Sequence, residues 1–158
     1  MDLDKLRDEL EADEGCRYEI YLDHLGYHTF GIGHLVVKGD PEYGKEPWTQ
    51  VTGSRVKEAF AHDIVTVLSD CQKLYEDFYE LPEEAQRVIA NMMFNMGYTR
   101  LSKFKGMKRG VDAEDWNAAA DEMVDSRWYN QVTNRADRLV KRMRNVNPVW
   151  GSTTTSME

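Results

Sequence analysis

Residues 14–35 read EGCRYEIYLDHLGYHTFGIGHL, and this stretch decides the fold expected for the N-terminal part of the chain. Apolar and β-favouring residues occur here in short runs, separated by turn-forming residues at positions 23–26. The pattern predicts a strand over residues 18–22, a second over 27–34 and a short third over 35–37. These three strands would form a small antiparallel sheet of hairpins.

A helix is predicted on either side of the hairpins. Leucines at helical spacing indicate a short amphipathic helix over residues 3–12. Thr52 can cap a second helix, whose apolar residues continue as far as Cys71. A helix of about twenty residues is about 30 Å long, so the second helix is long enough to join two lobes.

The C-terminal half of the chain is predicted to be helical. Pro82 and the two glutamates that follow it open a helix that ends at Gly97, because proline suits the first turn and acidic residues suit the positive end of the helix dipole. Asp112 and Thr133 are expected to cap two later helices. This half therefore adds helices to the sheet at the start of the chain.

A small sheet followed by helices predicts an α+β fold. We expect one domain over residues 1–150, with a β-rich lobe over about 14–51 and a helical lobe over about 52–150. The first helix, residues 3–12, is expected to belong to the helical lobe, and residues 151–158 are expected to form a disordered tail. A cleft between the two lobes is the natural place for a ligand.

The composition is that of a folded protein without a membrane-spanning segment. Of the 158 residues, 41% are hydrophobic and 11% aromatic, which is enough for a packed core and excludes a disordered chain. No apolar run approaches the ~18 residues that a membrane span needs, and the charged N-terminus has no apolar segment typical of a secretory signal. We therefore expect the protein to stay in the compartment where it is made and to need another agent to cross a membrane.

Charge is distributed unevenly along the chain, whose net charge is −8. Residues 1–99 carry nine Lys or Arg against twenty Asp or Glu, whereas residues 100–144 carry eleven against seven. The cationic C-terminal part could attract an anionic polymer, although solvated surface charge explains the same counts. An acidic chain without a long basic run is not expected to bind nucleic acid.

Three side chains in the hairpin region could perform acid and base chemistry. Glu14 lies at the end of the first helix, just before an apolar strand, where partial desolvation would favour its protonated form. Asp23 starts a hairpin turn, a more solvated setting that keeps a carboxylate ionised, and the hydroxyl of Thr29 could hold a water molecule. Hydrolysis of a glycosidic bond needs this division between an acid and a base. The spacing alone fits equally well a surface acid and a turn-forming aspartate.

Longer sequence matches favour the chemical interpretation. The spacing Glu14-x8-Asp23-x5-Thr29 is that of the catalytic trio in phage-type lysozymes. Two further segments resemble the same family, namely NMMFNMG at residues 91–97 and SRWYNQ at 126–131, the latter followed by NRA at 134–136. The three blocks occur in the family's order over most of the chain, which thus resembles the phage-type lysozymes and, among them, the T-even phage endolysins.

The resemblance implies a lysozyme-like α+β fold and a cofactor-free, metal-free glycoside hydrolase. Its expected substrate is bacterial peptidoglycan, cleaved at the β-1,4 bond between N-acetylmuramic acid and N-acetylglucosamine with inversion at the anomeric carbon. Glu14 would be the general acid, and Asp23 the base with Thr29 positioning the water. The family further implies a monomer that lyses the host cell. It would reach the wall from the host cytoplasm with the help of a separate membrane-permeabilising protein.

The resemblance also assigns supporting roles. Leu35 and Phe94 match positions that touch the sugar, and Arg135 matches a residue that pairs with the catalytic glutamate. Such a guanidinium would favour the ionised form of Glu14, against the effect of desolvation. The remaining supporting positions are Asn91 and the structural ion pair of His34 with Asp63.

The chain also departs from the T-even type. The stretch between His34 and Phe60 is shorter, so a short helix of the N-terminal lobe is expected to be missing. Met107 and Glu122 stand where a serine and an asparagine line the cleft. The sugar-binding roles of those two positions are therefore not carried over.

Three alternatives compete with a glycoside hydrolase. His24, His28 and His34 raise the possibility of a zinc amidase or peptidase, but the segment is predicted as turn and strand, and a zinc motif such as H-E-x-x-H is missing from the sequence. Cys16 could act as a nucleophile with a distant histidine, although both Cys16 and Cys71 are expected to be small, partly buried thiols. A non-enzymatic peptidoglycan-binding or virion module is the third, and the intact catalytic trio argues against it.

Overall fold

The computed structural model describes residues 1–146 and confirms the α+β fold expected from the sequence. The tail predicted over residues 151–158 lies outside this described part. The chain divides into two compact units. We call Leu3–Thr66 the sheet unit, and Val67 onward together with Met1–Asp2 the helical unit. Within residues 1–146, no helix has the length and apolar character needed to cross a membrane.

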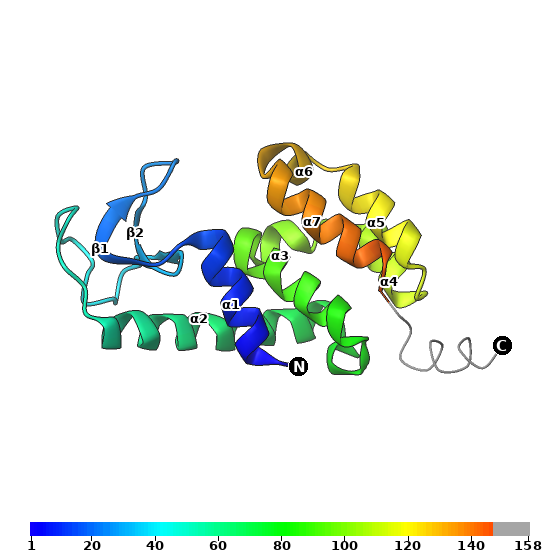
Figure 1. Ribbon diagram of the computed structural model, residues 1–158, viewed down its shortest axis with the longest axis horizontal. Helices are drawn as coiled ribbons and strands as arrows, with labels where there is room; N and C mark the ends of the chain where they lie inside the picture. The colour runs from blue at the N-terminus through cyan, green and yellow to red at the C-terminus, as the bar shows by residue number, and fades with distance from the viewer. Residues whose placement is uncertain (147–158) are drawn as a thin grey trace. The chain divides into compact units, whose positions relative to one another are not determined.

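The sheet unit contains one complete helix, the first part of a second helix and a three-stranded antiparallel sheet in the order β1-β2-β3 (Figure 1). Its first elements are α1 (Leu3–Glu14), β1 (Arg17–Leu22), β2 (His28–Gly31) and β3 (His34–Leu35). Tyr21 on β1 is paired with Thr29 on β2, and Thr29 is paired in turn with Leu35 on β3. The first helix was predicted to belong to the helical lobe, but it falls in this unit.

A tight turn divides the single strand that was predicted over residues 27–34. Gly31 and Gly33 have φ values of 60° and 59°, a region that glycine occupies without steric cost. The two glycines reverse the chain, so that His34 is paired with Phe30. The prediction of one long strand was therefore wrong, and the third strand starts at His34 instead of residue 35.

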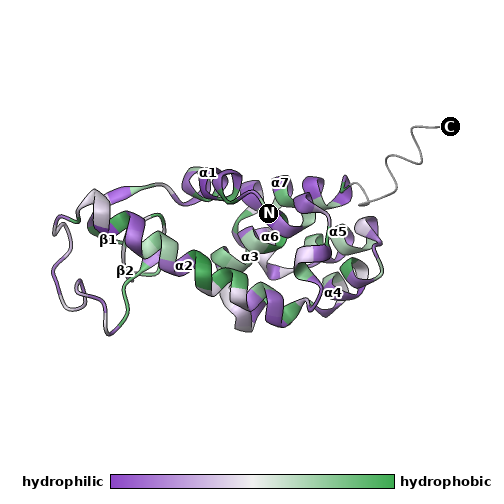
Figure 2. Ribbon diagram, turned by 90° about the horizontal axis from the view of Figure 1, so that it is seen from below, coloured by the Kyte–Doolittle hydropathy of each residue, from purple (hydrophilic) through white to green (hydrophobic). Residues whose placement is uncertain are grey.

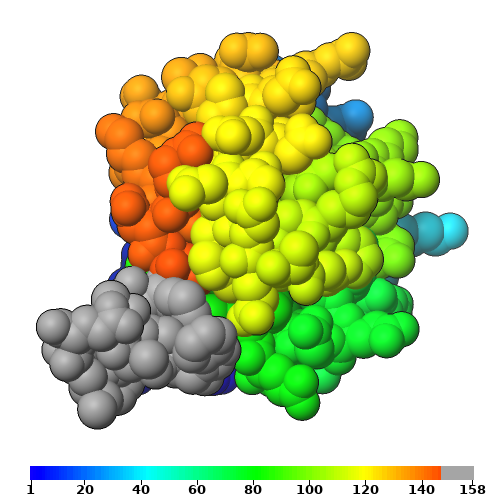
Figure 3. Space-filling model, turned by 90° about the vertical axis from the view of Figure 1, so that its right-hand side faces the viewer, coloured from blue at the N-terminus to red at the C-terminus, as the bar shows by residue number. Residues whose placement is uncertain are grey.

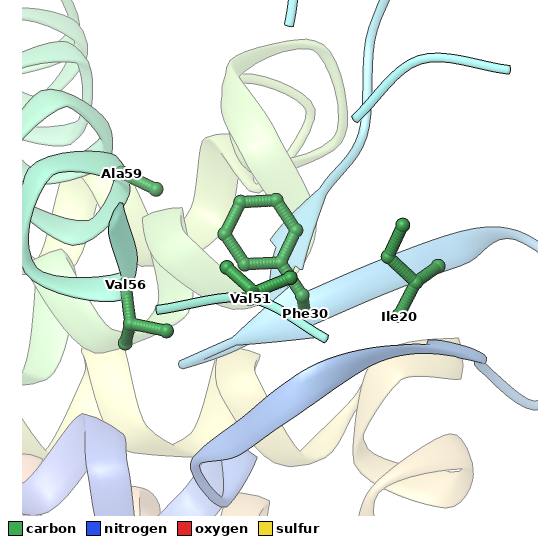
Figure 4. Close-up of a cluster of buried hydrophobic side chains, with 5 residues drawn as sticks. All are labelled: Ile20, Phe30, Val51, Val56 and Ala59. Carbon is green, nitrogen blue, oxygen red and sulfur yellow. The ribbon is translucent and has the colours of Figure 1, made fainter. Parts of the chain in front are cut away.

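A small apolar cluster fixes the sheet on the first half of α2 (Gly53–Leu74) (Figure 4). Ile20 and Phe30 come from neighbouring strands and are fully buried. The other members come from the chain before α2 and from one side of the helix: Val51, Val56 and Ala59. Burial of these side chains removes apolar surface from water and holds one face of the sheet against the helix.

The long helix α2 starts as predicted, since the backbone N–H of Arg55 donates to the Thr52 hydroxyl at 3.1 Å. Hydrophilic and hydrophobic residues are interspersed along α2 (Figure 2), as expected for an amphipathic helix. The boundary between the two units falls between Thr66 and Val67, inside this helix. α2 therefore contributes residues to both units.

Up to residue 146, the helical unit continues with a short 3-10 helix and five α-helices. They are η1 (Phe78–Glu80), α3 (Glu83–Leu101), α4 (Lys105–Asp112), α5 (Trp116–Val124), α6 (Arg127–Gln131) and α7 (Thr133–Arg144). Figure 3 shows α5 in yellow between α4 and the orange α7, and both neighbours pack on it. Buried side chains from α3, α5 and α7 form the core of this unit.

The helix ends of this unit differ in part from the predictions. The helical backbone is interrupted at Gly97, as predicted, but α3 resumes and continues to Leu101. Asp112 is the last residue of α4, and it is Asp115 whose carboxylate accepts from the backbone N–H of Ala118 at 3.0 Å. Thr133 begins α7 without a capping side-chain bond. The two predicted caps, Asp112 and Thr133, were therefore wrong.

Candidate active site

The predicted acid, Glu14, is the last residue of α1 and is half-buried. Its carboxyl group packs on the backbone of Gly33, at the tight turn between β2 and β3. A Cβ atom added to Gly33 would lie 2.7 Å from Oε1 and 3.0 Å from Cδ of Glu14. A side chain at this position would displace the Glu14 carboxyl group, so Gly33 helps to set the position of the acid.

The predicted base, Asp23, follows β1 and is held by the hairpin turn. Its Oδ1 accepts hydrogen bonds from the backbone N–H groups of Leu25 and Tyr27, both at 2.9 Å. No partner for Oδ2 lies among residues 1–146, and the side chain is partly exposed. The turn thus fixes the direction of the carboxylate through one oxygen and leaves the other to accept a proton.

Thr29 lies on the central strand and is only 5% exposed. Its hydroxyl donates to the carbonyl oxygen of Tyr27 at 3.0 Å. Because that bond uses the single donor, the hydroxyl oxygen can still accept a hydrogen bond from water. The residue is therefore suited to orient a water molecule rather than to act as a nucleophile.

Tyr21 connects the two carboxylates and was not predicted as a site residue. Burial raises the pKa of Tyr21, and the negative charges of Glu14 and Asp23 raise it further. The positive charge of Arg17 opposes this shift. Both carboxylates are therefore close enough to the Tyr21 phenol to act on its charge, so they lie in the same part of the sheet unit.

His34 holds the start of β3 through two carboxylates. Its Nδ1 lies 2.7 Å from Asp63 on α2, and its Nε2 lies 2.8 Å from Asp40 in the following loop. Burial disfavours the charged ring, but the bonds and charges of Asp63 and Asp40 outweigh it, so that the pKa of His34 is raised. Asp40 was not predicted as a partner of His34, because nothing in the sequence distinguishes it from the other acidic residues of the loop.

Arg55 extends this network on α2. Its Nε and Nη2 atoms donate to the two carboxylate oxygens of Glu42, each at 2.9 Å, and its Nη1 donates to Glu58 at 2.7 Å. Glu42 is only 6% exposed, and its hydrogen bonds to Arg55 lower its pKa. These contacts anchor the loop after β3 to the long helix, although neither Arg55 nor Glu42 was predicted to matter.

The remaining predicted residues are divided between the two units. Leu35 belongs to the sheet unit and is 48% exposed. In the helical unit, Nε of Arg135 on α7 donates to Oδ1 of the fully buried Asn91 on α3 at 2.9 Å, and Phe94 is half-buried on α3. The structure therefore brings Arg135 and Asn91 together.

The two departures from the family pattern also lie in the helical unit. Met107 is fully buried, so it contributes to the core of α4 rather than to its surface. Glu122 on α5 is half-buried, and its side chain packs over Gly106 on α4.

The structure offers little support for the metal and thiol alternatives. His24 is exposed, and both ring nitrogens of His34 are occupied by carboxylates. In the described part of the chain, no group of three His, Cys, Asp or Glu side chains could hold a metal ion. Cys16 packs against the apolar cluster of the sheet unit, and burial raises the pKa of Cys71 to about 12, which leaves its thiol unreactive.

Comparisons with known proteins identify the family. Residues 11–145 match the family model described as phage lysozyme. Probable T4-type lysozyme 2 of Dictyostelium discoideum is 30% identical over 156 residues, which cover 85% of this chain and 91% of that protein. The pre-baseplate central spike protein Gp5 of Enterobacteria phage T4 is 31% identical and covers 82% of this chain and 26% of that protein. Peptidoglycan hydrolase gp36 of Pseudomonas phage phiKMV is 29% identical over 90% of this chain and 15% of that protein. With its α+β fold and a match over most of its length, the chain belongs to the phage lysozyme family of glycoside hydrolases.

Proposed function

We propose that the protein is a muramidase that hydrolyses the β-1,4 bond between N-acetylmuramic acid and N-acetylglucosamine in bacterial peptidoglycan. The family membership supports a glycoside hydrolase, and the name of the phiKMV relative supports peptidoglycan as the polymer. The observation that carries the proposal is the setting of the two carboxylates. Glu14 is half-buried against Gly33, whereas Asp23 is held at a turn with one oxygen free of partners in the described chain.

Glu14 acts as the acid in this proposal. Its proton passes to the oxygen that bridges the two sugars, and the bond between that oxygen and the anomeric carbon breaks. A water molecule attacks the same carbon from the opposite face and gives a proton to Asp23, so that the configuration is inverted. Exchange of protons with solvent returns both carboxyl groups to their starting states.

Thr29 and Arg135 support this chemistry in different ways. The Thr29 hydroxyl accepts a hydrogen bond from the attacking water, since its own proton is given to the Tyr27 carbonyl. Thr29→Ala should therefore impair turnover. Arg135, which is anchored on Asn91, is assigned to the stability of the fold and to the acid limb of the pH profile. Arg135→Ala should change both.

The proposal extends to the biological role. We assign the protein to phage-induced lysis of the host, acting as a monomer without nucleic acid, metal or cofactor. It is made in the host cytoplasm, and a separate protein that permeabilises the membrane gives it access to the wall. Clearing of intact cells only when such a permeabilising agent is present would support this route, and clearing of untreated cells from outside would contradict it.

Turbidity clearing of chloroform-treated cells tests the reaction class. A muramidase releases new reducing sugar ends, and its activity is insensitive to chelators. Newly exposed amino groups would instead indicate an amidase or peptidase, and binding without clearing would indicate a passive wall-binding module. Each of the last two results contradicts the proposal.

Glu14→Gln tests the acid within the same assay. The amide cannot donate a proton to the leaving oxygen, so the rate should fall by about 10²-fold or more while the fold is kept. Glu11→Gln is the matched control, because Glu11 is another half-buried glutamate on α1. Wild-type activity of Glu14→Gln would remove the acid assignment, and an equal loss in Glu11→Gln would show that the effect is not specific to the acid.

A further inference from the structure

Trp48 is an exposed aromatic residue with an unusual backbone conformation. It is 68% exposed, and its φ of 72° lies in the left-handed region, where bulky residues are rare. Glycine or asparagine would occupy the same position with less strain. An exposed side chain that is kept in spite of backbone strain points to a function for that side chain.

The backbone around Trp48 is fixed along β1, which is an edge strand of the sheet. The N–H of Trp48 donates to the carbonyl of Ile20 at 2.6 Å, and the N–H of Ile20 donates to Thr49 at 2.9 Å. A third bond runs from the N–H of Val51 to the carbonyl of Tyr18 at 2.8 Å. The indole is therefore carried by a segment that is pinned to the sheet.

Arg17 links this indole to Tyr21. Its guanidinium carbon lies 4.2 Å from the centre of the Tyr21 ring and 5.6 Å from the centre of the Trp48 ring. Two of its nitrogens donate to Oε1 of Glu19, at 3.2 and 2.9 Å, so the charge of Arg17 is offset. We call Tyr21, Arg17 and Trp48 the aromatic strip. It combines two aromatic rings with a guanidinium whose charge is paired, and Trp48 is its exposed end.

One end of the aromatic strip is part of the candidate active site. Tyr21 is paired with Thr29 across the sheet and precedes Asp23 by two residues. The charges of Glu14 and Asp23 both raise the pKa of its phenol. The strip thus begins beside the two carboxylates and ends at Trp48, all within the sheet unit.

We propose that the aromatic strip is an extended saccharide subsite, in which Trp48 stacks on a sugar ring of the glycan strand beyond the bond that is cleaved. This inference rests on the proposed function. The apolar C–H face of a pyranose can pack against an aromatic ring. A tryptophan is suited to this contact at the surface, because its ring is apolar while its N–H group can stay in contact with water. A polymeric substrate must continue past the carboxylates between which it is cleaved, and the strip begins at Tyr21, which is paired with Thr29 of the candidate site.

The charges around the strip favour a sugar over a membrane. Anionic lipid surfaces attract clusters of Lys and Arg, whereas Arg17 is paired with Glu19 and residues 1–99 carry more than twice as many acidic as basic residues. The same charges argue against an anionic stem peptide as the main ligand of the strip. The uncharged sugar rings are the part of the polymer that can pack against the aromatic side chains of the strip.

The test compares two substrates without stem peptides, so that only sugars are recognised. One is a preparation of long soluble glycan strands, and the other is the shortest oligosaccharide that the wild-type protein cleaves. Trp48→Gly removes the ring and relieves the backbone strain, so the variant should remain folded, with an unchanged or higher melting temperature. We expect kcat/KM on the long strands to fall about tenfold, mainly through KM, as for loss of one aromatic contact. Cleavage of the short substrate should be unchanged.

Two control variants complete the experiment. Trp48→Phe keeps an aromatic ring and should retain most of the activity on long strands. Tyr43→Ala removes an aromatic side chain from the same loop, 59% exposed, and should change neither activity.

Several results would overturn the proposal. If Trp48→Gly lowers kcat/KM equally on both substrates, the strip is part of the cleavage site rather than an extension of it. Unchanged cleavage of long strands would remove the subsite altogether. Unchanged glycan kinetics together with Trp48-dependent binding to phosphatidylglycerol vesicles would make the strip a membrane contact. Cleavage of whole peptidoglycan without cleavage of any peptide-free glycan would show that sugar alone is not recognised, and would also overturn the subsite. If the wild-type protein releases no reducing ends from whole peptidoglycan, the proposed function itself fails, and that outcome is distinct from the others.

Discussion

Replacing Gly33 with alanine tests how closely the sheet holds Glu14, the proposed catalytic acid. The new methyl group would lie 2.7 Å from Oε1 and 3.0 Å from Cδ of Glu14, well inside the roughly 3.5 Å at which non-bonded heavy atoms attract most strongly. The carboxyl group must therefore move by about 1 Å, and a displacement of this size costs about 10²-fold in rate. In addition, a left-handed φ destabilises an alanine by about 1–2 kcal/mol.

Gly44→Ala separates displacement of the acid from backbone strain. Gly44 has a φ of 83°, and an added Cβ there would have no neighbouring atom within 4 Å. Urea denaturation should show similar losses of stability in the two variants, whereas release of reducing ends should fall only in Gly33→Ala. Equal activities of the two variants, with both folded, would refute the role of Gly33 in positioning Glu14.

Two further predictions concern the ion pairs that anchor β3 and its loop. The pKa of His34 is raised, so its pairs with Asp63 and Asp40 add stability below the unfolded value of about 6.5, and this stability is lost as the pH rises through the folded value. Urea denaturation at a series of pH values should show that the free energy of unfolding declines with rising pH in the wild type but not in His34→Asn. Parallel declines in the two proteins would contradict this role of His34. Arg55→Met leaves the buried Glu42 carboxylate without its main partner and should cost about 3 kcal/mol. The double variant with Glu42→Met should recover most of that loss in the same measurement, and no recovery would show that the cost lies elsewhere.

The proposed catalytic trio could be found in the sequence because its members are close together in the chain. Glu14, Asp23 and Thr29 occupy the end of a helix, a turn and the returning strand, and local patterns predict all three elements. The resemblance to a family then chose between an active site and ordinary surface acids. The division of the predicted second strand was missed, because its alternating pattern continues through the turn at Gly31 and Gly33.

Features that depend on distant parts of the chain were not predictable. Asp40 reaches His34 through a loop, and neither the loop path nor this partner is encoded in local spacing. Both Asp112 and Asp115 could cap a helix. Gly110 on α4 lies close to the backbone of Ala119 on α5, and this contact between the two helices sets where α5 begins. As a result Asp115, rather than Asp112, caps α5. The left-handed conformation of Trp48 contradicts local preference, so only the structure could reveal it.

The stereochemistry of the first product tests the central claim most directly. If Glu14 protonates the leaving oxygen while Asp23 activates water on the opposite face, the new reducing end must appear first as the α anomer. Proton NMR spectra recorded during the first moments of hydrolysis, before mutarotation, should show this α signal and only later the β signal. A β anomer that appears first would contradict the account, because retention requires a covalent intermediate that the proposed roles of these two carboxylates do not include.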